Sequence, residues 1–285
     1  MGARTGIMLA SPYSQRKLEK WITPDLPFVF GQRKLNGERL IWRNGRLLSS
    51  EGNLVTGIHH IVAALTEHFS SWHLDGEAYC HGMSRQIIHS IVSRELSKHP
   101  RMEEIKFHIF DTPTSDAQFK RLAWLMRNKE KIEAASPNLL VEETFRITSH
   151  AMAFDAVNQF VNDGYEGLII RHPLGVYAPL SRAVMMKWKP KEEDVYEIVE
   201  ALESDPAGKY KGSLGSFIVR DKEGRIFHVG SLKVTDRERA RLWSIRNRLP
   251  GEKCKVRYVE LTDAGIPPSS VYICLVSEEE DDDPR

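Results

Sequence analysis

Along the first 190 residues, short apolar runs typical of strands alternate with segments whose apolar residues recur at helical spacing. Runs such as "FVFGQRKL", "WHLDGEAYC", "IKFHIFD" and "GYEGLIIRHP" have strand length and lie between turn residues. In residues 84–96, four aliphatic side chains fall on one helical face, which predicts an amphipathic helix packed on a sheet. A second helix is predicted over residues 148–164, with Gly164 placed to end it.

After residue 191 the pattern changes to short strand-like runs bounded by turn residues. Five such runs, from "VYEIVEAL" to "VYICLVS", surround one helical segment at residues 235–249. This outline is typical of a small Greek-key barrel such as an OB-fold. A charged stretch around Pro190 separates the two patterns. We therefore expect an α+β domain over residues 1–190, followed by a small β-barrel domain over residues 191–277.

Composition excludes some classes of protein. Hydrophobic residues make up 41% and charged residues 28% of the 285 positions, as in ordinary globular proteins. No apolar run approaches the roughly 18 residues of a membrane span, and the first thirty residues lack a secretory signal pattern. The three widely spaced cysteines show neither a disulfide framework nor metal-site spacing. We expect a cytoplasmic protein that does not associate with membranes.

The charge is segregated along the chain. The net charge is +1, but residues 278–283 are six consecutive acids, and without them the charge would be +7. Residues 278–285 are predicted to be a disordered acidic tail. The basic remainder would suit a polyanionic partner, although charges this mixed are also typical of ordinary solvated surface.

The segment "RKLNGER", residues 33–39, places Lys34 beside a glycine between two apolar runs. It is either a surface hairpin or the position of a nucleophile. The segments "LDGEAY", "FHIFD", "EGLIIR" and "MMKWKP" place further charged or aromatic residues along apolar runs. Each segment is weak alone, but their order and spacing predict a cleft lined by a sheet. No G-x-x-x-x-G-K-[ST] pattern is present, which excludes a P-loop site.

In order, the five segments resemble motifs I, III, IIIa, IV and V of the covalent nucleotidyltransferases, which include ATP-dependent DNA ligases, RNA ligases and mRNA capping enzymes. "GSLGSFIVRD", "FHVGS" and "ELTDAGIPP" are similar to the ligase OB domain. The chain most resembles the small bacteriophage and bacterial ATP-dependent DNA ligases. The resemblance implies a nucleotidyltransferase (adenylation) domain, an OB-fold domain and the sealing of nicks in double-stranded DNA by a monomer.

The resemblance implies that Lys34 attacks the α-phosphate of ATP and forms a lysine-AMP adduct. A free lysine titrates at about 10.4, so the amine must be partly deprotonated to attack. Neighbouring cations favour the neutral form. Arg39, Lys187 and Lys189 are expected to supply this field and to hold the phosphates.

By the same resemblance, Glu77 is expected to bind the ribose hydroxyls and Phe110 to stack on adenine. Gln32 and Arg33 lie where the family reads the adenine edge. Glu166 is expected to bind a divalent metal. We expect magnesium, because this ion prefers oxygen ligands. Without the motif context, Phe110 would be read as a core residue and the two glutamates as surface carboxylates.

The sequence departs from the family pattern at several positions. Asn36 replaces the aspartate of the first motif, and an amide can neither carry that charge nor act as a base. Ser50 stands where an arginine is usual, and Arg171 where lysine is commoner. The run "GIPPSSVYICLV" lacks the basic residues of the final motif, for which Arg257 is one substitute. Lysine adenylation is compatible with these changes, whereas sealing is the step that Asn36 affects.

A ligase must hold phosphates on both sides of a nick without reading sequence. Asn36 and five basic residues are the DNA contacts we expect, although each cation alone would be read as ordinary surface: Arg182, Lys209, Lys211, Arg220 and Lys233. Two alternatives remain open. One is an RNA ligase or capping-type nucleotidyltransferase, and the other is a nick-binding protein with weakened sealing.

Overall fold

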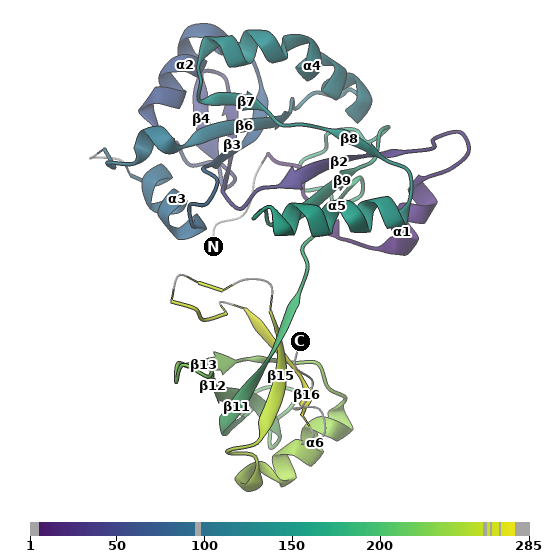
Figure 1. Ribbon diagram of the computed structural model, residues 1–285, viewed down its shortest axis with the longest axis vertical. Coiled ribbons are helices and arrows are strands. Elements are labelled where there is room, and N and C mark those ends of the chain that lie inside the picture. Colours follow the sequence, from purple (N-terminus) through teal and green to yellow (C-terminus); the bar gives the residue numbers. More distant parts are fainter. Residues whose placement is uncertain (1–5, 95–97, 259–260, 263, 268, 277–285) are drawn as a thin grey trace. The chain divides into compact units, whose positions relative to one another are not determined.

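The computed structural model describes residues 6–94, 98–258, 261–262, 264–267 and 269–276. The chain divides into two compact units, Met1–Lys189 and Pro190–Arg285 (Figure 1), and each is described by itself. The predicted acidic tail, residues 278–285, lies outside the described residues.

The first unit contains two five-stranded sheets. One sheet has the order β1-β10-β9-β2-β8, and β1 pairs parallel with β10 while the other pairs are antiparallel. Its strands are β1 (Ser11–Pro12), β2 (Val29–Lys34), β8 (Phe145–Ile147), β9 (Gly167–Arg171) and β10 (Met185–Trp188). The second sheet has the order β4-β3-β5-β6-β7. Its strands are β3 (Glu38–Arg43), β4 (Arg46–Ser49), β5 (Leu74–Tyr79), β6 (Lys106–Asp111) and β7 (Leu139–Val141).

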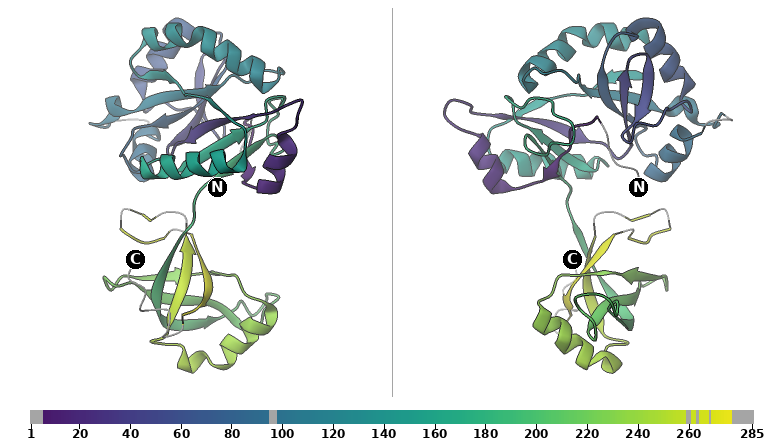
Figure 2. Two further views of the ribbon diagram at one scale, coloured as in Figure 1. Left: turned by 45° about the vertical axis from the view of Figure 1, so that its right-hand side comes forward. Right: turned by 180° about the vertical axis from the view of Figure 1, so that it is seen from behind.

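Each sheet has its own apolar core. Each sheet also has its own helices, which can be followed in Figures 1 and 2. The core of the β3 sheet includes apolar side chains of α2 (His59–Phe69), α3 (Arg85–Val92) and α4 (Gln118–Ala135). The core of the β2 sheet includes side chains of α1 (Gln15–Trp21) and α5 (His150–Asn162). A short 3-10 turn, η1 (Met102–Glu104), precedes β6.

The segment that carries Lys34 joins the two sheets. Lys34 ends β2 in one sheet, and four residues later Glu38 begins β3 in the other. The hairpin interpretation of this segment is therefore wrong, because β2 and β3 do not pair with each other. Gly37 allows the crossing, since a Cβ atom at this position would overlap the carbonyl oxygen of Ala78.

The second unit is built on a six-stranded sheet with the order β13-β12-β11-β15-β16-β14. The run "GRIFHVGS", expected as one strand, forms two, because β13 pairs with β12 and β14 pairs parallel with β16. The elements are β11 (Glu192–Glu203), β12 (Leu214–Arg220), β13 (Ile226–Val229), β14 (Ser231–Leu232), α6 (Asp236–Ser244), η2 (Arg246–Arg248), β15 (Lys253–Tyr258) and β16 (Ser270–Leu275).

The predicted α+β class is confirmed, and both predicted helices of the first unit are present as α3 and α5. Serine side chains cap their N-termini, at Ser84 and Ser149, and Gly164 adopts a positive φ just beyond α5. The 18-residue helix α4 was not assigned from the sequence. None of the described helices is long and apolar enough to cross a membrane.

We predict that Gly37→Ala lowers the free energy of unfolding by about 1–3 kcal/mol, because the added methyl group must displace the β5 backbone. Gly208→Ala is the matched control, since its Cβ would lie no closer than 3.2 Å to Asp205 and its backbone has no positive φ. Urea unfolding of both variants measures the difference. Equal stabilities would show that the crossing tolerates a side chain.

Candidate active site

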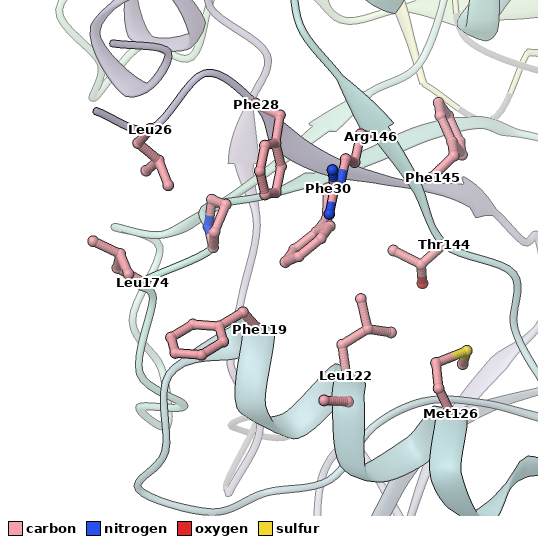
Figure 3. A pocket seen from close by; sticks show the side chains of 12 residues that line it. Leu26, Phe28, Phe30, Phe119, Leu122, Met126, Thr144, Phe145, Arg146 and Leu174 are labelled. Carbon is pink, nitrogen blue, oxygen red and sulfur yellow. The ribbon is translucent and has the colours of Figure 1, made fainter. Parts of the chain in front are cut away.

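Two cavities of the first unit differ in chemistry. The larger, about 600 Å³, is apolar and carries one ionisable side chain, Arg146 (Figure 3). Phe119 and Met126 of α4 face Phe28 and Phe30 across it. The smaller, about 260 Å³, is lined by eight lysines or arginines and three glutamates. Because polar chemistry needs convergent ionisable groups, the smaller cavity is the candidate site.

The fold gathers most of the predicted site residues in this charged cavity. Its lining includes Gln32, Arg33, Lys34, Asn36, Arg39, Glu77, Phe110, Glu166, Arg182, Lys187 and Lys189. These residues come from both sheets and from the segment that joins them. Four predicted DNA contacts, Lys209, Lys211, Arg220 and Lys233, instead belong to the second unit.

Glu166 fixes the position of Lys34. The Glu166 amide donates to the Lys34 carbonyl at 2.9 Å, and its carboxylate forms ion pairs with both Lys34 and Lys189. The next residue is Gly167. A glycine is needed here because β9 and β10 lie so close together that a Cβ atom would overlap the Trp188 carbonyl oxygen. The carboxylate therefore bridges two amines across neighbouring strands.

Arg39 is held by a buried carboxylate. Its Nε donates to Asp75 Oδ1 at 2.9 Å, and Nη1 donates to the Met8 carbonyl at 2.8 Å. The hydroxyl of Tyr177 also donates to Asp75, at 2.7 Å. Burial alone would lower the pKa of Arg39, but the Asp75 charge raises it above the ordinary value. Arg39 is thus a permanently charged part of the wall.

Phe110 lies between two guanidinium groups. The Cζ atoms of Arg39 and Arg171 are 5.3 Å and 5.1 Å from its ring centroid, which is cation–π distance. Arg171 donates to Gln32 Oε1 at 2.7 Å and to the buried Asp111 at 2.8 Å. Gln32 Nε2 in turn donates to the Phe110 carbonyl at 3.3 Å. This network fixes the ring that we expect to stack on a base.

The residues expected at the base edge already have protein partners. The Gln32 amide also donates to Thr144 at 2.8 Å, so both of its N–H groups are used. Arg33 Nε donates to the buried Glu142 at 2.6 Å, and Nη1 donates to the Tyr165 hydroxyl at 2.9 Å. A role for these two side chains in base recognition, which stays a prediction, requires them to exchange partners.

Glu77 is an acid with a strongly perturbed pKa. It lies on β5 opposite Arg39 and is partly buried. Burial raises its pKa to about 7, although the charges of Lys34 and Arg39 oppose the shift. Near neutral pH the carboxyl is therefore present in both protonation states. Such a group can accept a hydrogen bond from a hydroxyl or donate one to it.

The residues could hold a divalent cation only with help from a ligand. Among the described residues there is no group of three or more His, Cys, Asp or Glu side chains placed to bind a metal. Magnesium, however, is usually held by one or two carboxylates together with substrate phosphates. Glu166 fits that requirement, because it faces the cation-rich cavity where phosphates would be attracted.

Sequence reasoning missed the buried acids behind the cavity. Asp75, Asp111 and Glu142 each pair with an arginine of the lining and are almost completely buried. The available signal was an acid within or directly after an apolar strand run, as in "HLDGE" and "HIFD". Arg257, considered for the final motif, forms an ion pair with Glu193 in the second unit.

Two family models match the chain. One described as "ATP dependent DNA ligase domain" matches residues 7–189, and one described as "DNA ligase OB-like domain" matches residues 207–275. The matched segments correspond to the two kinds of domain expected in ligases. A search of the curated proteins gave no match.

Solved structures of ligases have the same fold. A structure of Lig E DNA ligases is 22% identical with a TM-score of 0.72, over 95% of this chain and 99% of that one. The Chlorella virus DNA ligase-adenylate is 19% identical with a TM-score of 0.53, over 97% and 99%. The ATP complex of the bacteriophage T7 ligase is 13% identical with a TM-score of 0.56, over 95% and 98%. At these identities the likeness shows the fold alone.

The raised pKa of Glu77 predicts a pH-dependent stability. Between its ordinary value of 4.5 and about 7, the folded protein binds more protons at Glu77 than the unfolded chain, so this residue lowers stability as pH rises through that window. Glu77→Gln removes the effect. We expect the variant to gain about 1–2 kcal/mol on the parent between pH 4.5 and 7.5, since partial exposure screens the charge. Urea unfolding across this range measures the gain, and a constant difference would contradict it.

Proposed function

The chain belongs to the ATP-dependent DNA ligase family, and we propose that it seals nicks in duplex DNA through an adenylate carried on Lys34. One observation carries the proposal: Lys34 lines a cavity together with seven other lysines or arginines, and its amine lies beside Glu166. This is the arrangement that a nucleophile needs to meet a triphosphate.

In the first step, the Lys34 amine attacks the α-phosphorus of ATP. An N–P bond forms, the bond between the α-phosphorus and the bridging oxygen breaks, and pyrophosphate leaves. The ion pair with Glu166 aims the amine but favours its charged form, so the pair must separate and the amine must lose a proton before attack. Lys187 and Lys189 lie on the same cavity wall and would attract the phosphates.

The two remaining steps transfer the AMP and join the ends. An oxygen of the nick's 5′-phosphate attacks the AMP phosphorus, and the N–P bond breaks to regenerate Lys34. The 3′-hydroxyl then attacks the activated 5′-phosphate, and AMP leaves. Asn36 lines the cavity beside Lys34, so it would meet the nick during these steps.

The other lining residues provide binding. Phe110, fixed between two guanidinium groups, would stack on the adenine. Glu77 would exchange hydrogen bonds with the ribose hydroxyls. Glu166 would hold a magnesium ion together with the phosphates, and such an ion would offset the negative charge that develops during transfer.

We predict that the protein becomes labelled when incubated with α-labelled ATP and magnesium, and that Lys34→Ala abolishes the label because the proposed nucleophile of the cavity is then missing. Lys129→Ala, which changes a half-exposed lysine of α4 outside the cavity lining, is the matched control and should label normally. Gel fluorography or mass spectrometry detects the adduct. Absence of label on the parent protein would overturn the proposed chemistry.

The nature of the base and of the nucleic acid separates this proposal from its nearest alternative. A DNA ligase of this family should label with ATP and seal nicked duplex DNA, whereas a capping-type enzyme would take GTP and an RNA ligase would prefer nicked RNA. Parallel assays with the two nucleotides and the two nicked substrates distinguish them.

Asn36 favours a second candidate, a nick-binding protein with weak sealing, because its amide cannot replace a carboxylate. We predict that Asn36→Asp leaves the rate of lysine adenylation within about two-fold and raises the rate of sealing by pre-adenylated protein about ten-fold, the usual contribution of a well-placed acid or base being at least this large. Labelling with α-labelled ATP measures the adenylation rate, and single-turnover sealing by pre-adenylated protein measures the sealing rate. Ordinary turnover by the parent would rule out the weak-sealing candidate.

A further inference from the structure

Arg85 is a cation of the candidate site that neither its sequence context nor the proposed chemistry assigns. It is the first residue of α3, and its side chain lines the same cavity as Lys34. Ser84 caps the helix at 3.4 Å through the Ile87 amide, which fixes where Arg85 leaves the backbone. The side chain is 55% exposed, so its donors face solvent at the cavity.

The guanidinium is held by the segment that carries the nucleophile. Arg85 Nη2 lies 4.0 Å from Glu38 Oε2, and the same carboxylate oxygen lies 3.1 Å from His89 Nδ1. The Glu38 side chain is only 16% exposed and stands four residues after Lys34. Arg85 is therefore anchored to the crossing between the sheets, while most of its five donors stay available.

Three of the four other arginines in the lining are committed elsewhere, and the fourth, Arg182, is already among the expected DNA contacts. Arg33, Arg39 and Arg171 each pair with an almost completely buried carboxylate. Those pairs serve the structure of the wall and the base-binding end. Arg85 instead pairs at long range with a carboxylate that is itself part of the cavity lining. The Arg85 guanidinium can therefore bind an anionic ligand that enters the cavity.

Ser50 lies on the same cavity lining and brings only a hydroxyl. A terminal phosphate carries close to two negative charges at neutral pH, and a guanidinium binds it best because its forked donors match two oxygens. Ser50 cannot supply this contact, and Arg39 of β3 is held by the buried Asp75. Arg85 is therefore the remaining arginine from the β3-sheet side of the lining that can do so.

We propose that Arg85 binds the 5′-phosphate of the nick and thereby selects phosphorylated ends. The inference rests on the proposed function, because it takes a nicked duplex as the ligand. Arg85 acts by binding substrate and not by proton transfer, since its guanidinium stays charged at any working pH. A nick with a 5′-hydroxyl lacks the phosphate dianion, so its binding affinity should not depend on Arg85.

Binding measurements in a Lys34→Ala background test the inference without turnover. Two fluorescent duplexes are compared, one with a 5′-phosphate at the nick and one with a 5′-hydroxyl. We expect Arg85→Ala to weaken binding of the phosphorylated nick about ten-fold and to change binding of the hydroxyl nick less than two-fold. The slope of log affinity against log salt on the phosphorylated nick should fall by about one.

Two further variants sharpen the result. Arg101→Ala removes an exposed arginine of the same unit that also pairs with a glutamate but does not line the cavity, and it should leave both affinities unchanged. Ser50→Arg, added to Arg85→Ala, should regain most of the lost affinity because residue 50 lines the same cavity. A double variant as weak as Arg85→Ala would count against the proposal.

An equal loss on both duplexes, or no loss on either, would overturn the role of Arg85. Thermal unfolding of each variant shows that the protein remains folded. The labelling of Lys34 by ATP is scored separately on the parent protein, so a failure of the adenylation chemistry is distinguishable from a failure of this inference. The difference in affinity between the two duplexes is measured in the Lys34→Ala background and therefore does not depend on adenylation.

Discussion

Electrostatic repulsion within one cavity is the constraint on which the rest of this structure depends. Eight lysines and arginines line the site, and like charges this close would destabilise an unbalanced fold. Buried carboxylates offset part of the repulsion: Asp75 pairs with Arg39, and Asp111 with Arg171. Each pair is also hydrogen-bonded, which such buried charges require. What remains is a positive cavity that is compatible with a folded protein and attractive to a polyphosphate.

Glu166 provides the same kind of charge compensation at the proposed nucleophile. In the protein alone its carboxylate bridges Lys34 and Lys189, and the Lys34 carbonyl accepts its amide. The bridge keeps two amines close together that would otherwise repel. In the proposed reaction, the negative charge of a bound triphosphate would replace that of Glu166 beside Lys34 and so free the amine when the substrate is present. Substrate binding and activation of Lys34 would thereby be linked through one carboxylate.

The two-sheet construction explains why the balance is possible. Lys34 ends a strand of one sheet, Glu77 lies on a strand of the other, and the segment through Gly37 carries the chain across in four residues. Each sheet keeps its own apolar core and helices, so the surface between them is free to hold polar groups. Burial at that surface is also what raises the pKa of Glu77. Burial of charged groups at that surface lowers the stability of the fold, but it also holds the charges of the site in fixed orientations.

The sequence by itself determined most of the longer strands, three of the helices and the α+β class, because apolar periodicity and turn residues are local properties. The motif residues that the fold gathers were identified through the family resemblance. It did not determine which strands pair. The segment at Lys34 reads equally well as a hairpin, and only the long-range pairing of β2 with β9 and β3 with β5 decided otherwise. The partners of the arginines and the place of Arg85 were likewise decided by tertiary structure. Contacts between residues far apart in the chain depend on how whole sheets pack, and no local pattern encodes them.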